Sequence, residues 1–141
     1  MSNLQELLER VEKAEGGDRA IDTALELLLL SATTKEFPGA DPRSGLVLIL
    51  DAKERWVTCD ADEYTASIDA TVALVEKMLP GCWVDLCGPR KYLHIPTPSP
   101  NHWRGMINAW NAQRDVVGWG ATPALALIAA LLRAMIAKEK E

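Results

Sequence analysis

The residues best suited to chemistry lie in one window of the chain, between Asp85 and Asp115, which contains no carboxylate. This window holds four cations together with imidazole and aromatic side chains: Arg90, Lys91, Arg104, Arg114, His94, His102, Tyr92, Trp103 and Trp110. The whole chain has a formal charge of −5, so without these cations the remainder carries about −9. Such an asymmetry predicts a surface that faces an anion.

Strand alternation within the window predicts which side chains share a face. In a strand over residues 103–110, Arg104, Asn108 and Trp110 lie on one side, and Tyr92 and His94 share a side of the strand before it. A guanidinium beside a stacking aromatic suits a nucleotide, a phosphate or an acidic patch on a protein. The predicted ligand- or partner-binding residues are Arg90, Lys91, Tyr92, His94, His102, Arg104, Asn108, Trp110 and Arg114. The alternative is a solvated sheet face whose cations pair with helix carboxylates.

Other chemistries have weaker support in the sequence. Asp85, Cys87 and His94 could act as orienter, nucleophile and base, but three such residues within ten positions arise easily by chance. Zinc bound by Cys59, Cys87, His94 and His102 would lack recognisable ligand spacing. The pI near 5.1 argues against nucleic acid as a partner. We therefore predict no catalytic residue, no metal and no cofactor.

The composition is that of a folded protein with one domain over residues 1–141. Hydrophobic residues make up 48% of the chain and charged residues 25%. The three cysteines have no CxxC spacing, which favours a reducing cytoplasm over a disulfide framework. The longest uncharged stretch, Val116–Leu132, is interrupted by Gly118, Gly120 and Pro123, so no membrane span is predicted.

The N-terminal part, residues 1–31, is predicted to be an αα-hairpin. Two helical patterns flank Gly16-Gly17, and Asp18 is suited to cap the second helix. In that helix Asp22 and Glu26 are expected to face solvent, opposite an apolar stripe of Ile21, Leu25, Leu28 and Leu29.

Residues 32–63 are predicted to be a variable loop or hairpin. Residues 31–44 are mainly polar and contain two prolines, which predicts a loop. Gly45–Leu50 and Arg55–Thr58 are candidate paired strands across Asp51–Glu54. Five apolar residues alone do not separate a strand from a buried helix.

Residues 64–141 are predicted to contain a helix, an antiparallel sheet and a buried C-terminal helix. Thr65 or Ser67 is suited to cap the first helix, whose expected apolar face is Ile68, Val72, Val75 and Leu79. Four candidate strands follow: Cys82–Cys87, Lys91–Ile95, Trp103–Trp110 and Asp115–Trp119. Their short connections imply antiparallel neighbours.

The C-terminal helix is expected to begin with Thr122 as N-cap and Pro123 at its first position. No charge occurs from Ala121 to Leu132, which indicates a helix buried on all sides. The predicted fold class is therefore α+β, with an antiparallel sheet of about four strands layered with helices as an α/β/α sandwich.

Three segments carry a resemblance to a known family. Asp18–Ala24 (DRAIDTA), Tyr64–Ala70 (YTASIDA) and Ala121–Leu127 (ATPALAL) resemble small phage and prophage proteins that carry the phage ABA sandwich domain. The resemblance covers about half of the chain and implies an antiparallel sheet layered with helices. These motifs consist of helix caps and Ala/Leu packing, so they support a fold and transfer no functional residue.

Together these observations predict a non-enzymatic phage or prophage accessory protein in the host-cell cytoplasm. It would bind an anionic, nucleotide-like ligand or a host protein, and a component of host defence is one such partner. Two alternatives stay open. One is a small nucleotide-processing enzyme with His94 or His102 as acid–base group. The other is a virion or assembly component, for which a homo-oligomer is expected.

Overall fold

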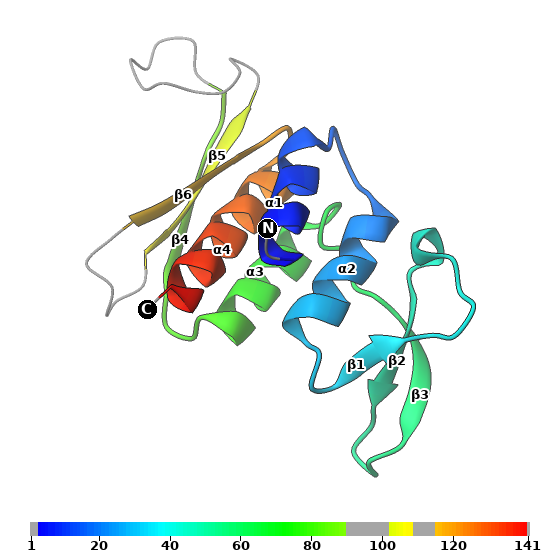
Figure 1. The fold of residues 1–141 in the computed structure, drawn as a ribbon. Helices are drawn as coiled ribbons and strands as arrows, with labels where there is room; N and C mark the ends of the chain where they lie inside the picture. Colours follow the sequence, from blue (N-terminus) through cyan, green and yellow to red (C-terminus); the bar gives the residue numbers. More distant parts are fainter. Residues whose placement is uncertain (1–2, 90–101, 109–114, 141) are drawn as a thin grey trace.

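A computed structural model describes residues 3–89, 102–108 and 115–140 (Figure 1). The described chain is α+β, with helices and two antiparallel sheets. Its elements, in chain order, are α1 (Asn3–Lys13), α2 (Arg19–Leu29), β1 (Thr34–Glu36), the short 3-10 helix η1 (Pro42–Ser44), β2 (Leu46–Leu50), β3 (Trp56–Asp60), α3 (Ile68–Met78), β4 (Trp83–Cys87), β5 (Trp103–Asn108), β6 (Asp115–Gly120) and α4 (Pro123–Glu139).

Within the described ranges the strands form two sheets of three, in the orders β1-β2-β3 and β4-β5-β6. The sequence predicted about four strands in one sheet, with a separate hairpin. Three of those four strands are found as β4, β5 and β6. The fourth, Lys91–Ile95, and the last two residues of the predicted Trp103–Trp110 strand lie outside the described residues. In the described order β4-β5-β6, β5 is the central strand.

The predicted hairpin in residues 45–58 is present as β2 and β3, which pair antiparallel from Leu46 opposite Asp60 to Leu50 opposite Trp56. The prediction of a loop throughout residues 31–44 was wrong, because β1 adds a third strand along β2. β1 has only three residues and no apolar alternation, so its sequence gives no strand signal. Pairing with β2 and burial of Thr34 at 4% exposure define it instead.

Helix caps were predicted well from the sequence. Asp18 accepts hydrogen bonds from the backbone N–H groups of Ala20 and Ile21 at the start of α2. Ser67, rather than Thr65, caps α3. Thr122 caps α4 and Pro123 occupies its first turn, as expected. These side chains satisfy backbone donors that a helix start leaves without partners.

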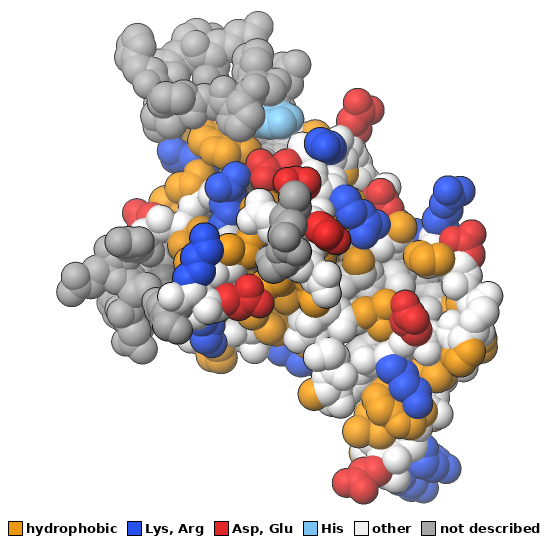
Figure 2. Space-filling view, viewed as in Figure 1, with side chains coloured by type: hydrophobic (Ala, Val, Ile, Leu, Met, Phe, Trp, Pro, Cys, Tyr) orange, Lys and Arg blue, Asp and Glu red, His pale blue; other side chains and the backbone are white. Residues whose placement is uncertain are grey.

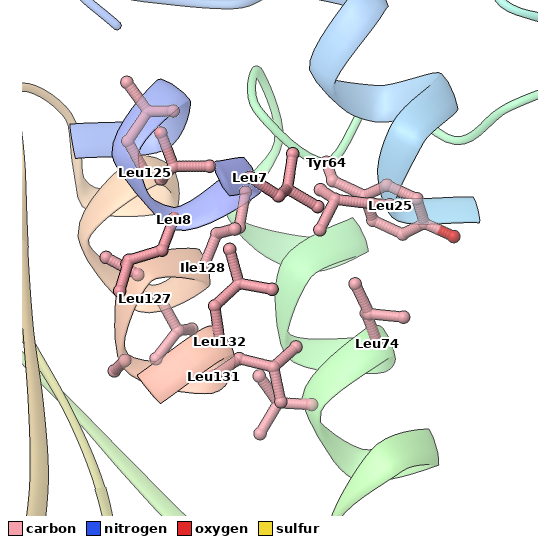
Figure 3. Packing of buried hydrophobic residues seen from close by; sticks show 14 of the residues in the cluster. Leu7, Leu8, Leu25, Tyr64, Leu74, Leu125, Leu127, Ile128, Leu131 and Leu132 are labelled. Carbon is pink, nitrogen blue, oxygen red and sulfur yellow. The ribbon is translucent and has the colours of Figure 1, made fainter. Parts of the chain in front are cut away.

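The core is built around α4, where every residue from Ala124 to Leu132 is buried. The prediction of a C-terminal helix buried on all sides is confirmed for this part. Leucines from three other helices, Leu7, Leu25 and Leu74, reach the same cluster (Figure 3). The side of α4 turned away from α1 and α3 lies on β5 and β6. α4 is thus a middle layer between a sheet and the other helices.

Glycines allow α4 to lie directly against the backbone of the second sheet. A Cβ atom added to Gly118 would lie 2.1 Å from the Ala130 nitrogen, and one added to Gly105 would lie 2.7 Å from the Ala126 carbonyl oxygen. Only a residue without a side chain fits at such distances. The described helices all lie on this one side of the β4–β6 sheet (Figure 1). The opposite face of the sheet carries no described helix.

Two predictions of helix orientation were wrong. Asp22 and Glu26 of α2 are buried, with only 1% and 7% of their surface exposed. Ile68, expected in the apolar face of α3, is 42% exposed, whereas Thr71 is fully buried. In each case a polar side chain has hydrogen-bond partners in the interior, and a count of apolar positions cannot detect such partners.

Candidate binding face of the second sheet

Three of the nine predicted binding residues lie in the described part of the chain. They are His102, directly before β5, and Arg104 and Asn108 within it. The other six, Arg90, Lys91, Tyr92, His94, Trp110 and Arg114, lie outside the described residues. Arg104 and Asn108 share one face of the sheet, as strand alternation predicted.

The register of β4, β5 and β6 defines that face completely. Residues directly opposite one another in an antiparallel pair project to the same side. We call the side turned away from α4 the outer face. It consists of three cross-strand rows: Cys87–Arg104–Trp119, Asp85–Met106–Val117 and Trp83–Asn108–Asp115.

The outer face exposes a large aromatic side chain on an otherwise mixed surface. Trp83 is 68% exposed, more than any other large hydrophobic residue of the described chain. Met106, Val117 and Trp119 are each half-buried, so the middle of the face is also apolar. Tryptophan, methionine and arginine are the residue types enriched at protein–protein contacts.

The electrostatics of the face centre on Arg104. Its guanidinium makes no hydrogen bond or ion pair with any residue that the structure describes, although it lies between Cys87 and Trp119 in its row. At the other end of β5, the Asn108 amide donates a 2.5 Å hydrogen bond to the Asp115 carboxylate. Among the described residues Arg104 has no such partner, and its guanidinium is suited to pair with a carboxylate or phosphate of a ligand.

Folding changes the charge pattern that the sequence displays. Asp85 and Asp115 bound the carboxylate-free window, and the sheet register brings both onto the outer face. The described part of this face thus carries one cation, Arg104, and two carboxylates. It is a surface of mixed charge, with its cation and one carboxylate, Asp115, at opposite ends of the sheet.

The hypothetical catalytic and metal-binding sets are only partly within the described chain. Asp85 and Cys87 lie on the same face, two residues apart, as expected for a strand. The His102 Nδ1 atom is buried and has no hydrogen-bond partner there. His94, which both hypotheses need, lies outside the described residues. No group of three or more His, Cys, Asp or Glu side chains in residues 3–89, 102–108 and 115–140 is arranged to hold a metal ion.

A second polar cluster, in the interior, was missed by sequence reasoning. The Asp22 carboxylate accepts hydrogen bonds from the Thr65 backbone N–H and the Thr65 hydroxyl, both at 2.8 Å. Arg19 donates to the other oxygen of Asp22 at 3.0 Å and to the Ala61 carbonyl at 2.8 Å. This cluster joins α2 to the segment before α3.

One turn further along α2, Glu26 accepts a 2.6 Å hydrogen bond from the Tyr64 hydroxyl. Burial of the phenol, together with this carboxylate, raises the pKa of Tyr64 above its ordinary value. Asp22 and its partner Thr65 belong to two of the segments that carry the family resemblance, Asp18–Ala24 and Tyr64–Ala70. Their shared presence is a signal that could have pointed to the contact.

Comparisons with protein-family models, curated proteins and solved structures find no match to this chain. In the described part of the chain, no helix has the length and apolar character needed to cross a bilayer.

Proposed function

We propose that this chain acts by binding a protein, and that the outer face of the β4–β6 sheet is the contact surface. One observation carries the proposal. Trp83, at 68% exposure, shares a sheet face with Arg104, Met106 and Trp119, and no described helix packs on that face. In this proposal a partner carboxylate pairs with Arg104, while apolar partner groups cover Trp83 and Met106.

The spacing of these groups favours a macromolecule over a small anion. Arg104 and Asn108 are four residues apart on β5, and Trp83 lies opposite Asn108. At about 3.3 Å per residue, the Arg104 and Trp83 rows are about 13 Å apart along the strand. A nucleotide base stacks on one ring at a time, so one small ligand would not engage both. The carboxylates of Asp85 and Asp115 also disfavour a polyanion.

A narrower site for a small anion has one supporting observation of its own. Arg104 and Trp119 are direct cross-strand neighbours on the outer face. A guanidinium beside an indole ring is suited to a phosphate with an attached planar group. A nucleotide-like ligand is therefore the second candidate, confined to this one row.

The origin and setting of the partner are proposed from the family resemblance alone. The three segments that resemble phage ABA sandwich proteins support a phage or prophage accessory protein with a layered sheet and helices. Such a protein would meet its partner in the host-cell cytoplasm, and a component of host defence is the partner class we favour.

Affinity capture with purified wild-type protein and matched variants tests the proposal. Arg104→Glu and Trp83→Ala are expected to lose the captured host protein, because each removes an anchor of the outer face. Arg43→Glu makes the same charge change on the exposed η1 segment, and Ile68→Ala removes an exposed apolar side chain from α3. Both control variants should retain the partner.

The purified partner is then titrated against each variant. Loss of a single interface anchor costs about 2 kcal/mol or more, which corresponds to an affinity about 30-fold weaker. Equal binding by Arg104→Glu and Arg43→Glu would refute the surface. A bound nucleotide that is lost in Arg104→Glu and Trp119→Ala but kept in Trp83→Ala would instead support the narrower site.

A further inference from the structure

The first sheet has an open edge along β3. The Asp51 N–H donates to the Arg55 carbonyl at 2.8 Å, and the Ala61 N–H donates to the Gly45 carbonyl at 2.7 Å. Antiparallel pairs alternate between hydrogen-bonded and non-hydrogen-bonded positions. Residues 55, 57, 59 and 61 therefore direct their backbone groups toward β2. Trp56, Thr58 and Asp60 direct theirs away from it.

This edge is accessible in the described structure. Trp56 is 40% exposed, and Thr58 and Asp60 are exposed as well. In the part of the chain that the structure describes, no strand pairs with β3 on this side. β3 contains neither proline nor lysine, two residue types that commonly protect edge strands from pairing.

We propose that two copies of the chain pair antiparallel along β3, with Thr58 on the two-fold axis. Thr58 of one copy then lies opposite Thr58 of the second, and Trp56 lies opposite Asp60. The outward backbone groups occur at every second residue, so the register must pair outward residues with outward residues. Centring on Thr58 is the register in which all three outward residues of each copy gain partners. The β1–β3 sheet of one copy and the β1–β3 sheet of the other would then form one continuous sheet of six strands through an isologous contact.

Charge disfavours the parallel arrangement of a second copy. Three carboxylates, Asp60, Asp62 and Glu63, are at the end of β3 and beyond it, whereas the turn before β3 carries two carboxylates and two cations, Asp51, Lys53, Glu54 and Arg55, with Arg55 paired to Asp51 at 3.2 Å. Antiparallel pairing sets the acidic end of one strand beside this turn of the other copy, which has no net charge, while parallel pairing would align the two acidic ends.

The side chains on one face of this sheet complement those of a second copy. The Lys35 ammonium lies 4.3 Å from the centre of the Trp56 ring. In the paired register, Asp60 of the second copy lies directly across from Trp56, next to this cation. Hydrophobic side chains lie beside both basic and acidic side chains over the β1–β3 region at the lower right of Figure 2.

Sedimentation velocity over a concentration series tests the pairing with three proteins. Wild type is expected to pass from monomer to dimer between about 1 and 200 µM, a range suited to a contact of a few strand hydrogen bonds. Thr58→Lys places two cations against each other at the axis and should weaken dimerisation at least tenfold. Thr58→Val keeps the backbone donor and a β-branched side chain, so it should dimerise like wild type.

Circular dichroism checks that each variant is folded. Folding is expected to be retained, because the residue 58 side chain is exposed and its backbone N–H and C=O groups point away from β2. A wild-type protein that stays monomeric over the whole series overturns the proposal. A Thr58→Lys variant that dimerises as strongly as wild type also overturns it, since the contact would then lie elsewhere.

Cross-linking tests the register independently. In Thr58→Cys the two new thiols face each other across the axis, at a separation of about 5.5 Å between Cα atoms, which a disulfide can bridge. Mild oxidation should give a dimer with a 58–58 disulfide, identified by peptide mapping. The native Cys59 is the internal control, because it lies opposite Val57 of the second copy. A 59–59 disulfide, or no 58–58 product, contradicts the Thr58-centred register.

Discussion

Replacing Asp22 by alanine should destabilise the protein far more than its position in an amphipathic helix suggests. Asp22 is 1% exposed and holds Thr65 through two hydrogen bonds of 2.8 Å. It also pairs with Arg19 at 3.0 Å. In Asp22→Ala the Thr65 backbone N–H stays buried and loses its acceptor, and Arg19 loses its counter-ion.

The magnitude follows from these three contacts. A hydrogen bond to a charged group contributes about 1.5–3 kcal/mol, and breaking a buried ion pair costs about 3–5 kcal/mol. These terms overlap, and Arg19, whose side chain is 29% exposed, regains some hydration. We therefore expect Asp22→Ala to lower the free energy of unfolding by about 3–5 kcal/mol. That is a large part of the 5–15 kcal/mol typical of a whole domain.

Urea denaturation followed by circular dichroism measures this loss, with two comparison variants. Asp22→Asn keeps an oxygen for both Thr65 bonds but gives up the charge, so a smaller loss of about 1–2 kcal/mol is expected. Asp69→Ala removes an exposed first-turn carboxylate of α3 and should cost about 0.3–1 kcal/mol. If Asp22→Ala and Asp69→Ala have equal midpoints at equal slopes, Asp22 is on the solvent side and the interior network is refuted.

Two further predictions concern the interior. Because burial and Glu26 raise the pKa of Tyr64, the unfolded chain ionises this phenol first as pH rises. Tyr64 therefore contributes fully to the free energy of unfolding below about pH 10, and this contribution falls at higher pH by up to about 1.4 kcal/mol per pH unit. In Tyr64→Phe, chemical denaturation at pH 9–11 should show that this decrease with pH is lost. Gly118→Ala should cost about 3 kcal/mol, because its methyl group would overlap the Ala130 backbone, whereas Gly16→Ala meets no atom within 4 Å. Equal thermal midpoints for the two glycine variants would contradict the close packing of α4.

The sequence predicts this fold well where local chemistry determines it. Asp18, Ser67 and Thr122 cap their helices because each presents a side-chain oxygen at a helix start, whatever the rest of the chain does. The uncharged run beginning at Ala121 can only be buried, and α4 is the centre of the core. The hairpin of β2 and β3 was predicted from a short apolar run followed by turn residues.

The failures occur where a distant partner decides the outcome. Asp22 and Glu26 point inward because Thr65 and Tyr64, about 40 residues away, bring hydrogen bonds to them. β1 is a strand because its backbone pairs with that of β2, which lies more than ten residues further along the chain. For the candidate site, alternation placed Arg104 and Asn108 on one face, but the presence of Trp83 there depends on the register between strands, which the sequence does not contain.

The inner face of the second sheet has a consequence for how this protein can change. Gly105 and Gly118 touch the α4 backbone, so almost any replacement there would push sheet and helix apart. The residues that alternate with them along the strands, including Arg104, Met106 and Val117, project to the opposite face, which carries no described helix. Along each strand, every second residue therefore faces α4, and the residues in between can be replaced without disturbing the packing of the sheet on this helix. A new binding specificity could arise by exchanging outer side chains alone, with no structural compensation needed in the core.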